Sequence, residues 1–110
     1  MAVLFLIPGV VVKEGACVIG MQPQIVRGCI TVGKTYKTFC PYMRVLTSGV
    51  DGTHGPASLH YKGLAADFRI INVPPNKRAA LRDAVKSALG TGFDVVLESD
   101  HLHVEWDPKP

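Results

Sequence analysis

The sequence predicts an α+β domain in which two main helices pack against a small, mostly antiparallel sheet. Three observations lead to this fold class. Apolar residues recur at helical spacing in two stretches, they alternate or cluster in several short stretches, and the last two short stretches are close enough to form a hairpin. The 110 residues, of which 47% are apolar, fit one globular domain spanning residues 1–110.

The N-terminal part is expected to contain two extended segments and one helix. Residues 2–7 and 10–13 are apolar enough to form strands or buried segments. The helix is expected to begin within residues 20–24, because Pro23 suits a first-turn position. Two glycines within this stretch lower its helical propensity. Its apolar face consists of Ile25, Cys29, Val32 and Tyr36.

The middle of the chain is expected to hold two strands separated by a loop. Residues 44–47 predict a short strand, and residues 48–58 are rich in glycine and polar side chains, as loops are. Residues 65–71 then predict a second strand. Strand alternation puts Asp67 and Arg69 on one of its faces and the larger apolar side chains on the other.

The C-terminal part predicts a helix followed by a hairpin. Residues 74–75 are two prolines that can begin a helix, and Gly90 can end it. Residues 93–97 and 102–106 have strand composition. The turn residues 98–100 between them are few, which favours antiparallel pairing.

Charge gives no indication of a nucleic-acid or membrane partner. The net charge is +3, and the basic residues are scattered rather than gathered in a run. The apolar opening, residues 1–12, is shorter than the roughly 20 residues of a membrane span. It also lacks the charged start and cleavage site of a signal peptide. We therefore expect a monomer made in a cytoplasm without an export signal.

The three cysteines do not form a recognisable metal or redox motif. Cys17, Cys29 and Cys40 are widely spaced, and no Cys-x-x-Cys pair occurs. We expect them to act as small buried hydrophobic residues in a reducing compartment.

The histidines are the chemically informative residues. All four fall in two groups, His54 with His60 and His101 with His103, and Asp67 lies seven residues after His60. His101 and His103 are two apart on a predicted strand, so they share a face. Two imidazoles, one carboxylate and one open position form the ligand set of a catalytic zinc ion. Histidines that merely pack in the core or lie at the surface remain the alternative at this point.

Two motifs give the sequence a resemblance to a known family. Residues 58–67 read Ser-Leu-His-Tyr-Lys-Gly-Leu-Ala-Ala-Asp, which matches Ser-x-His-x-x-Gly-x-Ala-x-Asp, and residues 100–103 supply an Asp-His-x-His sequence. Over about residues 45–106 the chain resembles the zinc peptidases that include D-alanyl-D-alanine carboxypeptidases and phage L-alanyl-D-glutamate endopeptidases. The same fold group contains lysostaphin-type enzymes and the hedgehog signalling domain.

The resemblance implies a role for each matching residue. His60, Asp67 and His103 would bind one zinc ion. Asp100, three residues before the last ligand, would be the general base, and His101 would polarise or hydrogen-bond the substrate. An alternative register, in which Glu98 serves as the base and His101 as the ligand, has the same spacing.

Further residues are candidates for substrate binding. The resemblance implies that Ser58 shapes the site, together with Gly63. Asp51 and His54 could contact substrate or could simply form a turn. Trp106 could line a peptide groove or pack as a core or rim aromatic residue.

The resemblance implies a peptidase that cuts the peptide stems of bacterial peptidoglycan. Many relatives that release terminal D-alanine carry an arginine upstream of the Ser-x-His motif that can bind the carboxylate of the substrate, whereas residues 48–54 here contain no arginine. Arg44 and Arg69 are the nearest substitutes in the sequence. We therefore expect a phage-type L-Ala–D-Glu endopeptidase that acts at the cell wall, in a lytic or virion-associated role. A D-Ala-D-Ala carboxypeptidase and a non-catalytic zinc-containing binding module are the alternatives.

Overall fold

The computed structural model describes residues 7, 9–13, 15–39, 45–50 and 58–108. Several features singled out in the sequence lie wholly or partly outside these ranges: the segment 2–7, Cys40, the first residue of the strand 44–47 (Arg44), and most of the loop 48–58, including Asp51 and His54.

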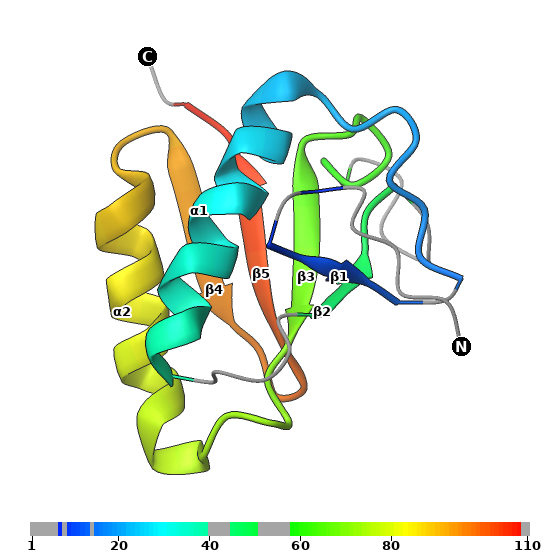
Figure 1. The fold of residues 1–110 in the computed structure, drawn as a ribbon. Coiled ribbons are helices and arrows are strands. Elements are labelled where there is room, and N and C mark those ends of the chain that lie inside the picture. The colour runs from blue at the N-terminus through cyan, green and yellow to red at the C-terminus, as the bar shows by residue number, and fades with distance from the viewer. Residues whose placement is uncertain (1–6, 8, 14, 40–44, 51–57, 109–110) are drawn as a thin grey trace.

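The structure is an α+β fold with one five-stranded sheet (Figure 1). The sheet order is β1-β2-β3-β5-β4, and all neighbouring strands are antiparallel except β1 and β2, which are parallel. The predicted fold class is therefore confirmed, with a mixed rather than purely antiparallel sheet. The elements are β1 (Val11–Val12), α1 (Pro23–Phe39), β2 (Val45–Ser48), β3 (Ala65–Arg69), α2 (Arg78–Leu89), β4 (Phe93–Leu97) and β5 (His101–Trp106).

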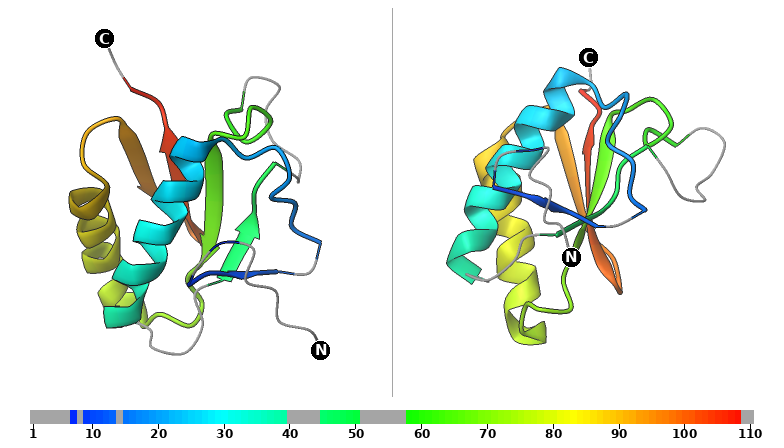
Figure 2. Two further views of the ribbon diagram at one scale, coloured as in Figure 1. Left: turned by 45° about the horizontal axis from the view of Figure 1, so that its top comes forward. Right: turned by 45° about the vertical axis from the view of Figure 1, so that its right-hand side comes forward.

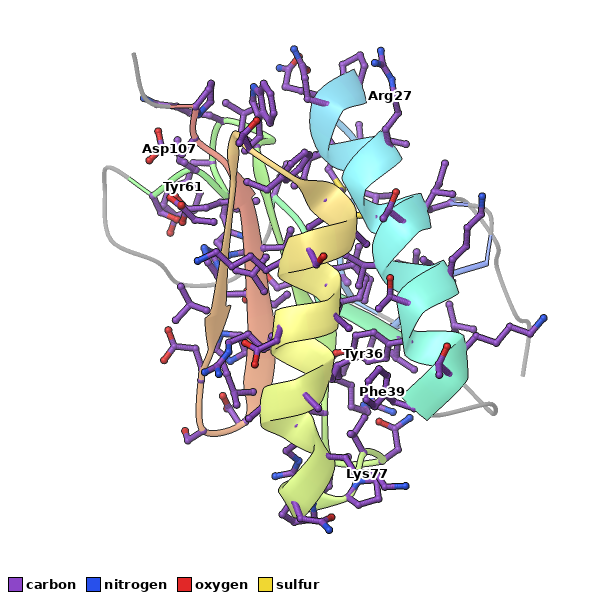
Figure 3. The ribbon with its side chains drawn as sticks, turned by 90° about the vertical axis from the view of Figure 1, so that its left-hand side faces the viewer. Arg27, Tyr36, Phe39, Tyr61, Lys77 and Asp107 are labelled. Atoms are coloured by element: carbon purple, nitrogen blue, oxygen red, sulfur yellow. The ribbon has the colours of Figure 1, made fainter. Side chains whose placement is uncertain are left out.

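Both helices lie on the same side of the sheet, as two further views show (Figure 2). They pack against each other as well as against the strands. Tyr36 extends from α1 into the interior, where its ring centroid lies 6.0 Å from that of Phe68 on β3 (Figure 3). Apolar burial between the helices and this face of the sheet forms the core. Within the described part of the chain, no helix is long and apolar enough to cross a membrane.

The glycines that weaken the prediction of α1 have a packing role. A Cβ atom at Gly28 would lie only 2.8 Å from a ring carbon of Phe93 on β4. One at Gly33 would lie 3.0 Å from the backbone oxygen of Gly9. The helix therefore approaches its neighbours more closely than a larger residue would allow, and this packing outweighs the loss of propensity.

The second helix begins later than its sequence predicts. Residues Pro75–Lys77 form a 3-10 turn, in which the Lys77 N–H donates to the Pro74 carbonyl at 2.8 Å, and α2 follows. Proline has no N–H to donate, which favours a short, irregular first turn. The predicted end is confirmed, because Gly90 has a φ of 77° directly after the helix.

Strand alternation gives the sheet one apolar face and one face that carries the titratable residues. Ala66 and Phe68 on β3 are fully buried on the helix side of the sheet. Leu102 and Val104 on β5 are also fully buried on this side. The intervening side chains belong to the other face, which we call the site face. It carries Asp67, Arg69, His101, His103 and Glu105.

A tight turn before β3 links the site face to the start of α1. Gly63 in this turn has a φ of 71°, and its carbonyl oxygen accepts a hydrogen bond from the Gln22 N–H at 2.8 Å. A Cβ atom at Gly63 would collide with the carbonyl oxygen of Gly20. Both the left-handed backbone and the close approach therefore require glycine here.

Substituting Gly63 with alanine should destabilise the fold more than the same change at Gly90. Both residues have positive φ, but a Cβ atom at Gly90 would meet nothing within 4 Å. The difference between the two variants therefore isolates the collision with Gly20, and we expect Gly63→Ala to cost about 1–3 kcal/mol more in free energy of unfolding. Urea denaturation of both variants measures it. Equal losses of stability would show that the positive φ alone, and not the contact with Gly20, requires glycine at position 63.

Candidate metal centre

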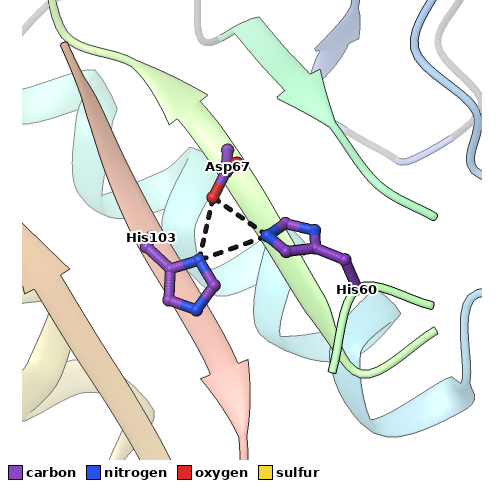
Figure 4. Close-up of side chains that lie close together, drawn as sticks. All are labelled: His60, Asp67 and His103. Carbon is purple, nitrogen blue, oxygen red and sulfur yellow. Dashed lines mark hydrogen bonds and ion pairs between the residues drawn. The ribbon is translucent and has the colours of Figure 1, made fainter. Parts of the chain in front are cut away.

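Three side chains converge on the site face to form a candidate metal centre (Figure 4). His60 Nε2 and His103 Nδ1 lie 3.3 Å and 2.9 Å from Asp67 Oδ1, and 3.3 Å from each other. His60 and Asp67 are buried, at 2% and 6% exposure, while His103 is partly exposed. This group could bind a metal ion, with its accessible side at His103.

The register of the sheet brings two of the three residues together. Asp67 on β3 pairs directly with His103 on β5, so the two side chains leave neighbouring strands at the same level. His60 comes from the turn that precedes β3, and the Ser58 hydroxyl accepts a hydrogen bond from the His60 backbone N–H at 3.2 Å. Ser58 thus shapes the turn that presents His60.

The separations between the three atoms suit a tetrahedral ion. Bonds of about 2.0–2.1 Å at tetrahedral angles place neighbouring ligand atoms about 3.3 Å apart. Two of the three separations have this value, and the third, between Asp67 and His103, is shorter because the two groups hydrogen-bond directly. If the separation between Asp67 Oδ1 and His103 Nδ1 widened by a few tenths of an ångström, all three pairs of atoms would have the tetrahedral spacing. The three ligands leave one tetrahedral position for another group.

A backbone carbonyl selects the nitrogen that His60 presents. Its Nδ1 lies 2.7 Å from the carbonyl oxygen of Gly49, which can only accept, so Nδ1 carries a proton and Nε2 is the nitrogen directed at Asp67 and the metal position. A Cβ atom at Gly49 would collide with the carbonyl oxygen of Cys17. Glycine therefore allows this backbone to lie close enough to orient the ligand.

Glu105 orients His103 in the same way, and sequence reasoning missed it. Its Oε1 lies 2.7 Å from His103 Nε2, which leaves Nδ1 directed at the metal position. Carboxylates that hold a ligating histidine in this manner raise its basicity and fix its ring. The signal was present in the sequence, because Glu105 is two residues after His103 and strand alternation puts it on the same face.

Hydrogen bonding keeps Asp67 ionised although it is buried. Burial alone would raise the pKa of this carboxyl. The hydrogen bonds from His103 and His60, with the charges of His60 and His101, outweigh burial and hold the pKa of Asp67 well below its usual range. Asp67 is therefore a carboxylate, the form that binds metal ions.

His103 has a higher pKa than an ordinary histidine. Its hydrogen bond to Asp67 raises its pKa, burial opposes this, and the hydrogen bond to Glu105 raises the pKa further. With both ring nitrogens beside carboxylates, the imidazolium form is favoured. A metal ion would have to displace the proton on Nδ1, while Nε2–H continues to donate to Glu105.

The predicted catalytic residues lie beside this centre. His101 Nδ1 is 2.6 Å from Asp100 Oδ1, and His101 Nε2 is 3.6 Å from Asp67 Oδ1. The Asp100 side chain is 84% exposed, whereas that of His101 is 30% exposed. His101 therefore lies between a solvent-facing carboxylate and the candidate metal position. Its ring does not belong to the close group of three, which favours the register with His103 as ligand over the alternative with Glu98 and His101.

A pocket of about 590 Å³ opens at this side of the site face. Its lining includes Asp67, Asp100 and His101, so the pocket borders one of the three candidate ligands and the Asp100–His101 pair, whereas His60 and His103 are not part of its lining.

Trp106 lies in a different environment. Its ring packs edge-on against Phe93, with centroids 4.9 Å apart, and it lines a smaller pocket with residues of α1 and α2. Of the two roles that the sequence left open for Trp106, this placement supports packing over lining a peptide groove.

Cys29 is buried, which raises its thiol pKa to about 12 and keeps it in the unreactive thiol form.

Comparison with models of known protein families and with curated proteins finds no match to this chain.

Replacing Glu105 with alanine should weaken metal binding without removing a ligand. Loss of such an orienting partner typically lowers metal affinity by about 10–100-fold. Competition with a chromophoric chelator measures the affinity, and Glu98→Ala is the matched control because this exposed glutamate lies outside the group. Equal affinities of the Glu105→Ala and unmodified proteins would contradict the orienting role.

Metal affinity should also fall as the pH is lowered. Because the pKa of His103 is raised, its proton competes with the metal ion up to a higher pH than that of an ordinary histidine. Each displaced proton costs about tenfold in apparent affinity per pH unit below the pKa. Chelator competition between pH 8 and pH 5.5 should show this loss, with a plateau at the alkaline end. An affinity that is constant over this range would mean that His103 is not a ligand.

Proposed function

We propose that the protein is a zinc-dependent peptidase that hydrolyses peptide stems of bacterial peptidoglycan, as an L-Ala–D-Glu endopeptidase of the phage type. The observation that carries the proposal is the convergence of His60, Asp67 and His103 beside a pocket that also holds Asp100 and His101. A metal centre with an open position, together with a second carboxylate and a third histidine, is a complete set for metal-assisted hydrolysis.

The donor atoms favour zinc over the common alternatives. Two imidazole nitrogens and one carboxylate oxygen suit a four-coordinate zinc ion with an exchangeable position. Calcium and magnesium prefer six or more oxygen ligands, which this group does not offer. Zinc, when bound, lowers the pKa of a coordinated water molecule to about 7 and polarises the substrate carbonyl.

Asp100 and His101 would handle the protons. As general base, Asp100 accepts a proton from the attacking water and returns it to the leaving amine. Its hydrogen bond to His101 holds the carboxylate beside the pocket. His101, positioned by that bond, directs Nε2 towards the metal side and can stabilise charge on the substrate oxygen.

The substrate is proposed on the two sequence motifs. The Ser-x-His-x-x-Gly-x-Ala-x-Asp and His-x-His sequences resemble those of enzymes that act on cell-wall peptides, and the site residues that they contain are the ones that converge here. The Asp100–His101 pair favours an enzyme over a non-catalytic zinc module, which has no need of a general base. Asp51 and His54 remain candidate substrate contacts.

The roles of Asp67 and Asp100 should be separable by substitution. Asp67→Ala removes a ligand and should abolish both zinc binding and hydrolysis. Asp100→Asn keeps the shape of the side chain and should retain zinc while lowering the rate by about 10²–10⁴-fold, as expected for loss of a general base. Glu98→Gln is the control for the alternative base. Zinc content and release of soluble peptides from purified peptidoglycan measure the two effects.

Normal hydrolysis by Asp100→Asn would overturn the assignment of the base, and hydrolysis by zinc-free protein would overturn the proposal as a whole. Mass spectrometry of the products distinguishes the bonds. New L-alanine carboxyl ends support the endopeptidase, whereas free D-alanine would indicate the carboxypeptidase.

A further inference from the structure

His60 is held from two directions by stretches of the chain that lie outside the strands. Its ring Nδ1 donates to the carbonyl oxygen of Gly49, the first residue after β2, at 2.7 Å. Its backbone belongs to the turn before β3, in which the Gly63 N–H donates to the His60 carbonyl oxygen at 3.1 Å. The ring therefore keeps its orientation only while the two stretches keep their relative position.

A third stretch of the chain, which leads from β1 to α1, is hydrogen-bonded to both of them (Figure 2). We call it the bridging segment, residues 17–22. At its start, the Cys17 carbonyl oxygen accepts a hydrogen bond from the Val50 N–H at 2.9 Å. At its end, the Gln22 N–H donates to the Gly63 carbonyl oxygen at 2.8 Å. The bridging segment therefore connects the stretch that orients the ring with the turn that carries the backbone.

Met21 is the residue of the bridging segment that lies against both supports of His60. A Cβ atom at Gly63 would lie 3.0 Å from the Met21 Cα, and one at Gly49 would lie 3.1 Å from the Met21 sulfur. The Met21 side chain thus extends from the turn to the residue that orients the ring. It is partly buried and packs against the hydrophobic core, which holds it in this position. An unbranched thioether suits such an irregular gap.

The two sequence motifs do not account for how Gly49 is held in place. The bridging segment lies outside residues 45–106, the part of the chain that carries the resemblance. A metal ligand has to be held within about 0.5 Å of its productive position. Outer groups that orient a ligating histidine contribute much of this precision. A movement of Gly49 away from the turn would break the hydrogen bond to His60 Nδ1 and free the ring to rotate.

We propose that Met21 is a positioning residue for the metal centre. Through its contacts with the two glycines, it holds the His60 ring in the orientation that directs Nε2 at the metal position. Met21 itself binds neither the ion nor the substrate. The inference rests on the metal centre of the proposed function and is independent of the peptide bond that is cut.

Shortening the Met21 side chain in the whole protein tests this role. Met21→Ala should weaken zinc binding by about tenfold, the lower end of the range for the loss of an orienting group. Competition with a chromophoric chelator measures this affinity. In NMR spectra of the same variant, the His60 Nδ1 proton should exchange faster with water, because its hydrogen bond to Gly49 is less firmly held.

Two control variants separate positioning from a general loss of stability. Met21→Leu keeps a methyl group near the place of the sulfur and should restore both the zinc affinity and the slow proton exchange. Ile30→Ala removes apolar volume from α1, where Ile30 packs against the core but is not among the atoms nearest the two glycines. This variant should unfold at a lower urea concentration and leave both properties unchanged.

Unchanged zinc affinity and unchanged proton exchange in Met21→Ala would overturn the positioning role. An equal loss of both in Ile30→Ala would also overturn it, because the effect would then follow stability. Met21→Val, which likewise has no atom at the place of the sulfur, replaces Met21→Ala if that variant does not fold.

Failure of this inference is distinguishable from failure of the proposed function. If the protein binds zinc but does not hydrolyse peptidoglycan, the proposed function is wrong, while Met21→Ala still lowers the zinc affinity. If zinc-dependent hydrolysis is observed and Met21→Ala binds zinc as tightly as the unmodified protein, only the positioning role is wrong.

Discussion

The pairing of β3 with β5 is the constraint on which the site depends. This register sets Asp67 opposite His103 and Arg69 opposite His101, so two candidate ligands and two neighbouring residues share one face of the sheet. A shift of one residue would turn all four side chains toward the helices. The buried apolar residues between them, among them Phe68 and Leu102, prevent that shift because they fill the core. Core packing and site geometry are therefore fixed by the same alternation.

Burial of a carboxylate between two histidines explains why the remaining contacts are present. A buried charge is unfavourable unless it is compensated, and here His60 and His103 supply the compensation. Each histidine is in turn oriented by a group on its far side, the Gly49 carbonyl oxygen for one and Glu105 for the other. The three candidate ligand atoms are thereby directed at one point. A cation bound at that point would interact favourably with all three of these atoms in the folded protein only. Metal binding would therefore stabilise the fold.

Much of the fold and the three converging residues could be predicted from the sequence. Periodicity was sufficient for α1 and the hairpin, and histidine grouping with a carboxylate indicated the metal site. The parallel pairing of β1 with β2 could not be predicted, because it depends on a long-range contact between short segments. Glu105 was missed because a charged residue on a strand is usually a solvated one.

The most direct test of the central claim is X-ray absorption spectroscopy of the zinc-loaded protein. The account predicts one zinc ion with only nitrogen and oxygen neighbours at about 2.0–2.1 Å, and with the multiple-scattering signature of two imidazoles. It further predicts that one imidazole is lost in His103→Ala. A zinc–sulfur distance of about 2.3 Å would instead indicate binding by cysteine, and an all-oxygen shell would indicate an adventitious surface site. Either result would contradict a metal centre formed by His60, Asp67 and His103.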